Sequence, residues 1–121
     1  MRTRADIITR IELPSGSVMV DGHGYLCDPG QWSVEFAEHA ARAEGIGLTA
    51  AHLEVVKFMR AYLEDHGIMA DARFVLKFLA QRDRLSKTGA KAVLFELFPY
   101  GYVRQACKIA GMRQPRAWST G

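Results

Sequence analysis

The pattern of hydrophobic and polar positions changes once along the chain, near Ser33. Before that point, RIELP and SVMVDGHGYL contain short apolar runs interrupted by Gly, Pro and Asp, a pattern typical of a small β-hairpin or meander. The segment CDPGQW is predicted to be a loop, because Pro29 and Gly30 interrupt it. Residues 1–9 are expected to form a loose N-terminal arm.

After Ser33 the pattern predicts about five helices with short connections. Each segment has an apolar stripe at helical spacing, and most begin with a capping residue and end at Gly or Pro. The predicted segments are SVEFAEHAARAEG, TAAHLEVVKFMRAYLEDHG, DARFVLKFLAQRD, KTGAKAVLFELF and YVRQACKIA. The expected caps of the first three are Ser33, Thr49 and Asp71, and Gly111 followed by Pro115 should end the fifth. The prediction is a mainly α (α+β) fold with an N-terminal β-hairpin.

Composition is consistent with one ordinary globular domain spanning residues 1–121. The chain has 121 residues, 49% hydrophobic and 24% charged, enough to bury a core. The apolar runs are too short for a membrane span, and the N-terminus lacks the apolar stretch of a signal peptide. Cys27 and Cys107 lie far apart and form no CxxC pair, which argues against a disulfide scaffold and a zinc site. A cytoplasmic, reduced protein is expected.

The positive charge is concentrated at the C-terminal end. From Leu97 onward there are four cations and no Asp or Glu, which leaves 12 of the 16 cations against all 13 acids. A basic tail attracts acidic protein surfaces or phosphates, and it also promotes solubility. The sequence favours neither interpretation over the other.

No motif of metal, nucleotide or serine chemistry is present. The chain lacks GxGxxG, a phosphate-binding loop, GxSxG and HExxH, and its four histidines are scattered. We therefore expect no cofactor and no metal site.

Cys107 is the main candidate for chemistry. It lies on the apolar stripe of the fifth predicted helix, and a free cysteine in such a stripe most often packs as a small hydrophobe. Arg104 and Lys108 lie close to it in the sequence, and nearby cations favour the reactive thiolate. From these residues alone, packing is favoured over reactivity.

The second and third predicted helices, joined by HGIM, could form a helix-turn-helix with Arg73 and Lys77 on its second helix. Helical hairpins are common in bundles, and no set of base-reading side chains lies at the start of that helix, so DNA reading ranks below ordinary packing. Near the C-terminus, Trp118 either packs into a groove of the domain or contacts a partner.

Several of these segments together resemble the DsrC/TusE family of small sulfur-trafficking proteins. The resemblance covers VDGHGYL, Trp32, LTAAHLEVVKFMRAYLEDHGI, ARFVLKFL and above all LFELFPYGYVRQACKIAGMRQP. It implies a mainly helical fold with a β-hairpin, a flexible C-terminal arm (residues 112–121 here) and no cofactor. It also implies sulfur carried as a persulfide or trisulfide on arm cysteines. The implied partners are sulfurtransferases, dissimilatory sulfite reductase or the tRNA-thiolation machinery.

The sequence departs from the family pattern at the outer part of the arm. The resemblance places the family's chief sulfur-carrying cysteine at Trp118, whereas the inner cysteine is kept as Cys107. Tyr102 stands where the family usually has Pro. A mechanism in which two arm thiols hold one sulfur and close a disulfide therefore cannot run within this arm.

Three interpretations follow. In the first, which we take as the leading one, Cys107 accepts sulfane sulfur and Arg104 and Lys108 stabilise its thiolate. In the second, the chain is a regulatory paralogue that binds the same partners without carrying sulfur. In the third, it binds nucleic acid weakly as a regulator of sulfur metabolism, through the helix-turn-helix and the basic tail.

Overall fold

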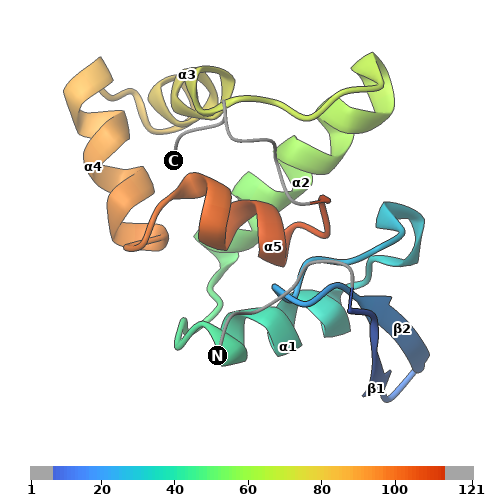
Figure 1. Cartoon of the computed structure of the whole chain (residues 1–121). Helices are drawn as coiled ribbons and strands as arrows, with labels where there is room; N and C mark the ends of the chain where they lie inside the picture. Colours follow the sequence, from blue (N-terminus) through green and yellow to red (C-terminus); the bar gives the residue numbers. More distant parts are fainter. Residues whose placement is uncertain (1–6, 114–121) are drawn as a thin grey trace.

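The computed structural model describes residues 7–113 (Figure 1). The elements in chain order are β1 (Thr9–Leu13), β2 (Gly16–Val20), the 3-10 turn η1 (Pro29–Gln31), α1 (Val34–Ala43), α2 (Ala50–His66), α3 (Ala72–Asp83), α4 (Lys87–Leu97), the π-helical segment η2 (Tyr102–Ala106) and α5 (Cys107–Ile109). This arrangement confirms the predicted fold class, helices plus an N-terminal hairpin. Among residues 7–113, no helix has the length and apolar content needed to cross a membrane.

The β-hairpin packs one face against the helices. β1 and β2 are antiparallel, with Thr9 opposite Val20 and Leu13 opposite Gly16. Val18 and Val20 are buried, as the period-two pattern of a half-buried strand requires. The backbone N–H of Ser15 donates to the Glu35 carboxylate at 3.0 Å, which ties the hairpin turn to the first turn of α1. Thr9 belongs to β1, so the predicted loose arm (1–9) is wrong at its last residue.

The helix starts agree with the predicted caps. The side chains of Ser33, Thr49 and Asp71 each accept a hydrogen bond from a backbone N–H in the first turn of α1, α2 and α3. Ser86 caps α4 in the same way, a cap that the sequence analysis did not name. The predicted stop at Gly67 is also observed, in the left-handed conformation.

The centre of the molecule is built from α2 and the fifth helical segment. Val55, Val56 and Met59 of α2 have no exposed surface, and neither do Cys107 and Ile109. Figure 1 shows α5 in the middle of the helices, with α1 on the hairpin side and α3 and α4 at the opposite end. The predicted continuous fifth helix is corrected by the structure, because η2 has π-helical hydrogen bonding and α5 is a single turn. π-helical turns are rare in proteins overall, but those that occur often lie at functional sites.

The end of α5 is anchored by Trp32 and Arg60. The Trp32 indole Nε1–H donates to the Ile109 carbonyl at 2.9 Å. The Arg60 guanidinium lies 4.6 Å from the Trp32 ring centroid and donates to the carbonyl of Ala110 at 2.8 Å. Gly111 packs so closely that an added Cβ would lie 2.5 Å from Trp32 Cδ1. These contacts fix where the chain leaves α5.

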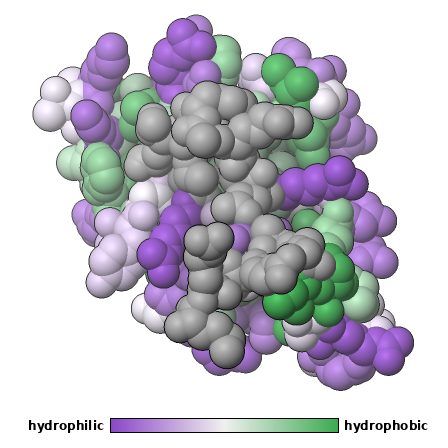
Figure 2. All heavy atoms as spheres, viewed as in Figure 1, coloured by the Kyte–Doolittle hydropathy of each residue, from purple (hydrophilic) through white to green (hydrophobic). Residues whose placement is uncertain are grey.

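Hydrophobic side chains on the face seen in Figure 2 gather near the hairpin, and most of the outline is hydrophilic. Ile7, Ile8 and Met19 are the exposed large apolar side chains of the hairpin region within the described chain. The predicted C-terminal arm (112–121) lies outside the described residues from position 114 onward, and Trp118 lies there too.

Candidate functional site around Cys107

Cys107 lies at the first residue of α5 and is completely buried. Its Sγ–H donates to Sδ of Met69, which precedes α3, at 3.5 Å, and the Tyr102 hydroxyl of η2 lies near the thiol. The Tyr102 hydroxyl donates to the carbonyl of Ala70. The thiol is therefore enclosed between its own helical segment and the connection from α2 to α3.

Burial controls the ionisation of this thiol. It raises the pKa of Cys107 to about 12, while the nearby Tyr102 hydroxyl acts in the opposite direction. A thiol with a pKa raised that far stays protonated at neutral pH. In this conformation, which we call closed, the Cys107 thiol has neither exposed surface nor a group that favours its ionisation over burial.

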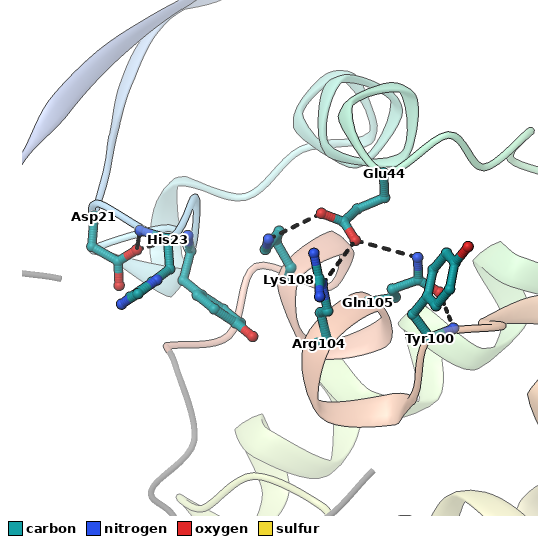
Figure 3. Close-up of polar contacts among 8 residues, drawn as sticks. Asp21, His23, Glu44, Tyr100, Arg104, Gln105 and Lys108 are labelled. Carbon is teal, nitrogen blue, oxygen red and sulfur yellow. Dashed lines mark hydrogen bonds and ion pairs between the residues drawn. The ribbon is translucent and has the colours of Figure 1, made fainter. Parts of the chain in front are cut away.

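The two cations predicted to assist Cys107 both contact Glu44, the C-cap residue that follows α1. Lys108 Nζ lies 3.1 Å from Glu44 Oε2, with both side chains almost fully covered. Arg104 Nε lies 3.8 Å from Glu44 Oε1, with its side chain 69% exposed. Gln105 Nε2 donates to Oε1 at 3.2 Å. Figure 3 shows Glu44 facing these three side chains of one helical segment, a group that we call the Glu44 cluster.

The loop after β2 supports the same cluster from the other side. The Asp21 carboxylate accepts the backbone N–H groups of His23 and Tyr25 at 2.8 and 3.0 Å, which folds the loop. Lys108 Nζ lies 5.2 Å from the Tyr25 ring centroid, and its aliphatic stem passes Gly24. The VDGHGYL segment thus positions Lys108 toward Glu44.

Glu44 is the residue that sequence reasoning missed. It stands immediately before Gly45, at the negative end of the α1 dipole, where a carboxylate is unfavourable. An acid in that place signals a specific cationic partner. The sequence could not identify this partner, because Lys108 lies on a distant segment.

Tyr100 and Arg104 give the cluster an exposed edge. Tyr100 is 74% exposed, although its backbone N–H is fixed by Gln105 Oε1 at 2.9 Å. Figure 3 shows both side chains beside Gln105 at the outer side of the segment. A large exposed ring on a rigid backbone, next to an exposed guanidinium, has the composition of a protein-contact surface.

The remaining candidates show no assembled metal or thiol site. Cys27 is half-buried, and both cysteines are free. Within residues 7–113, no three His, Cys, Asp or Glu side chains converge as metal ligands. His52 is buried, pairs with the Leu97 carbonyl at 2.8 Å and packs edge-on against Phe98, so its role is structural.

The helices α2 and α3 are joined by a short turn as predicted, but nothing shows that they contact nucleic acid. That interpretation stays a prediction. A gel shift at low salt that disappears steeply as salt rises would support it, because phosphate contacts release counterions.

Comparison with known proteins places the chain in a family. The sequence profile of the "DsrC like protein" family matches residues 12–117. Sulfurtransferase TusE of Pectobacterium atrosepticum is 37% identical over 105 residues, which cover 87% of this chain and 95% of that protein. Sulfurtransferase TusE of Yersinia pestis has the same identity, length of match and coverage.

Solved structures agree with the sequence relatives. The NMR structure of Allochromatium vinosum DsrC superposes with a TM-score of 0.80 at 30% identity and covers 92% of this chain and 98% of that one. The oxidised gamma subunit of the dissimilatory sulfite reductase (DsrC) from Archaeoglobus fulgidus has a TM-score of 0.77 at 27% identity, covering 90% and 98%. This chain belongs to the DsrC-like family, which confirms the resemblance seen in the sequence. The sulfur-accepting role of Cys107 and the supporting roles of Arg104 and Lys108 stay predictions.

Proposed function

We propose that this chain works in a sulfur-relay pathway by docking to partner proteins, and that it carries no sulfur while it is closed. The observation that supports this most directly is the burial of Cys107, with its pKa raised to about 12. Accepting sulfur requires a thiolate that reaches the outer sulfur of a donor persulfide. The closed conformation offers neither access nor ionisation.

The names of the relatives support the pathway and the class of partner. They are called sulfurtransferase TusE, and the structural neighbours include a gamma subunit of dissimilatory sulfite reductase. The partners of this chain are therefore sulfurtransferase-type or sulfite-reductase-type proteins, with the tRNA-thiolation machinery as one setting. Tyr100 and Arg104 supply the contact surface, because both are exposed on a backbone that Gln105 holds in place.

A second candidate function is that of a sulfur carrier opened by its partner. It is favoured by the position of Glu44, which forms ion pairs with both Arg104 and Lys108, the cations close to Cys107 in the sequence. If a partner displaced Glu44 and exposed the thiol, Arg104 and Lys108 would be free to stabilise the thiolate. The Cys107 thiolate would then attack the outer sulfur of a donor persulfide, and the donor thiolate would leave.

Intact-mass spectrometry tests whether the closed conformation accepts sulfur without a partner. In a Cys27→Ser variant, Cys107 is the only thiol, and glutathione persulfide serves as a defined donor. The folded variant should gain no sulfur during a time in which the urea-unfolded variant gains one sulfur atom. A folded chain that gains sulfur as fast as the unfolded one would overturn the closed, non-carrier proposal.

Co-purification tests the docking surface. Tagged chain is recovered from cells that naturally produce it, and its sulfurtransferase and sulfite reductase partners are quantified. Tyr100→Ala and Arg104→Glu should reduce recovery, whereas Cys107→Ser and the control Lys91→Glu, an exposed cation of α4, should not. Loss of every partner on Cys107→Ser, in a variant that still folds, would favour the carrier function instead.

A further inference from the structure

A hollow lies on α3 and the start of α4, on elements that do not contribute to the Glu44 cluster. Its volume is about 420 Å³, and the described residues that line it are Arg73, Phe74, Leu76, Lys77, Ala80 and Lys87. Figure 1 shows α3 and α4 packed together at the end of the molecule away from the hairpin. We call this hollow the α3 groove. Its volume lies within the usual range of ligand pockets, about 300–1,000 Å³.

The lining of the groove is predominantly apolar. Phe74, Leu76 and Ala80 supply its apolar surface, and Phe74 remains 38% exposed. The Phe74 ring is held from one side by Tyr62 of α2, with ring centroids 5.3 Å apart in a stacked arrangement. The Arg73 guanidinium also lies over the Phe74 ring, 5.4 Å from its centroid. The part of this fixed ring that stays exposed offers apolar surface to a partner at little cost in conformational entropy.

All the charged side chains among the described lining residues are cations. Arg73 is partly compensated by Asp71, at 3.1 Å. Lys77 and Lys87 have no carboxylate within ion-pair distance among residues 7–113. Lys87 is also the first residue of α4, where the helix dipole already contributes positive potential. The groove therefore combines apolar surface with an uncompensated positive border.

We propose that the α3 groove binds an acidic amphipathic segment of a partner protein. Such a segment places apolar side chains against Phe74, Leu76 and Ala80, and its carboxylates meet Lys77 and Lys87. An apolar helix face laid into a groove is a common mode of peptide recognition. The inference concerns a second contact surface and does not rest on the behaviour of Cys107.

Charge and polarity argue against two other occupants. The tail of this chain, residues 114–121 (QPRAWSTG), contains Arg116 and no Asp or Glu. Its side-chain charge has the same sign as that of the groove and is repelled by it. A nucleic acid would satisfy the cations but would leave the apolar surface without a partner, and binding through phosphates needs no such surface.

Fluorescence anisotropy with a designed probe tests the proposal on the full chain. The probe is a fluorescein-labelled helical peptide of Glu, Ala and Leu, with Leu at every third or fourth position. Control ligands are a scrambled peptide of identical composition, the same peptide with Lys for Glu, a single-stranded DNA oligonucleotide, and a peptide copying residues 112–121. Saturable binding of the Glu–Leu probe alone, weakened by salt, is the expected result.

Matched variants locate the binding. Lys77→Glu combined with Lys87→Glu should lower the affinity for the Glu–Leu probe about tenfold or more, because like charges would face the carboxylates of the probe. Lys57→Glu, which reverses one charge on α2 outside the groove, is the control for Lys77→Glu alone and should change affinity by less than about twofold. Phe74→Ser should weaken binding without changing net charge. Chemical-shift changes in the NMR spectrum should centre on α3, and each variant's thermal unfolding is recorded to confirm its fold.

Several results would overturn the proposal. Equal binding of the scrambled probe, or an equal loss with Lys57→Glu, would reduce the effect to general charge attraction. Binding of the oligonucleotide but not the probe would make the surface a nucleic-acid site. Preferential binding of the 112–121 peptide would make the groove a seat for the chain's own arm. Since none of these measurements involves Cys107 or Tyr100, the docking function proposed above would be unaffected.

Discussion

At the scale of single residues, Glu44 is the counter-charge of the two cations that lie close to Cys107 in the sequence. Its carboxylate meets the ammonium of Lys108, the guanidinium of Arg104 and the amide of Gln105. Lys108 is only 13% exposed, so the pair is removed from most of the solvent. An ion pair of this kind contributes little by itself, but losing one partner leaves a buried charge without compensation.

Replacing Glu44 with Gln should therefore destabilise the fold by about 1–3 kcal/mol, since the covered ammonium of Lys108 loses its counter-charge. Urea unfolding followed by circular dichroism measures the change. Glu38→Gln, an exposed carboxylate of α1, serves as the control and should cost less than about 0.5 kcal/mol. Adding Lys108→Met to Glu44→Gln should recover part of the loss; equal losses for Glu44→Gln and Glu38→Gln would contradict this account.

The two cysteines should differ in their reaction with iodoacetamide. Cys27 is half-buried, whereas Cys107 is covered and has a pKa raised to about 12. Because alkylation requires a thiolate that is accessible, one thiol per chain should react in the native protein and two after unfolding in urea. Peptide mass mapping identifies the site. Native labelling of Cys107 at the rate of Cys27 would show that the closed conformation opens readily.

At the scale of elements, the sequence predicted the features that depend on residues close together in the chain, such as the starts of helices. Ser33, Thr49 and Asp71 cap the helices they were expected to cap, because a cap depends on a hydrogen bond to a residue two or three positions away. The fifth helix was predicted as regular, and its π-helical start could not be foreseen. Its geometry depends on Gln105, whose side chain reaches both Tyr100 and the distant Glu44.

The exit from α5 provides a prediction at this scale. Gly45 and Gly111 have nearly the same φ, 73° and 75°, but only Gly111 has a close neighbour, with an added Cβ 2.5 Å from Trp32 Cδ1. Gly45→Ala should cost about 1 kcal/mol for the left-handed backbone alone. Gly111→Ala should cost a further 1–3 kcal/mol, roughly, because the Trp32 ring must shift.

Urea unfolding of both variants measures this difference. With Trp118→Phe in every protein compared, the remaining fluorescence is that of Trp32, and it should change only in Gly111→Ala. Gly47→Ala, with neither a positive φ nor a neighbour within 4 Å, is the second control and should be nearly neutral. Equal costs for Gly45→Ala and Gly111→Ala would mean that Trp32 does not hold the end of α5 as tightly as its contacts indicate.

At the scale of the whole molecule, the fold class was predictable and the site was not. The periodicity of apolar positions and the family resemblance both lead to helices with a β-hairpin, and the structure has that arrangement. The candidate site depends on contacts between α1, the loop after β2 and the fifth helical segment. Sequence pattern alone shows that Lys108 is near Cys107 in the chain, but not that Glu44 faces it.

Alkaline pH should destabilise the whole molecule because several buried hydroxyl and thiol groups stay protonated in the fold. Burial raises the pKa of Cys107 from an ordinary value of 9.0 to about 12 and that of Tyr25 from 10.0 to about 12, and it also raises that of Tyr102. In the unfolded chain these groups lose protons near their ordinary values. Above about pH 9 the native state therefore binds more protons than the unfolded state, so the free energy of unfolding falls as pH rises.

The contribution of these groups is fully present below about pH 9 and is lost progressively toward pH 12. Urea unfolding at about pH 8, 9, 10 and 11 should show this decline, beginning near the ordinary pKa of cysteine. Cys107→Ser keeps a small polar side chain that does not titrate in this range, so its decline should begin about one pH unit higher, near the ordinary pKa of tyrosine. Identical profiles for the two proteins would mean that the thiol ionises as easily in the fold as outside it, and that Cys107 is more accessible than its burial indicates.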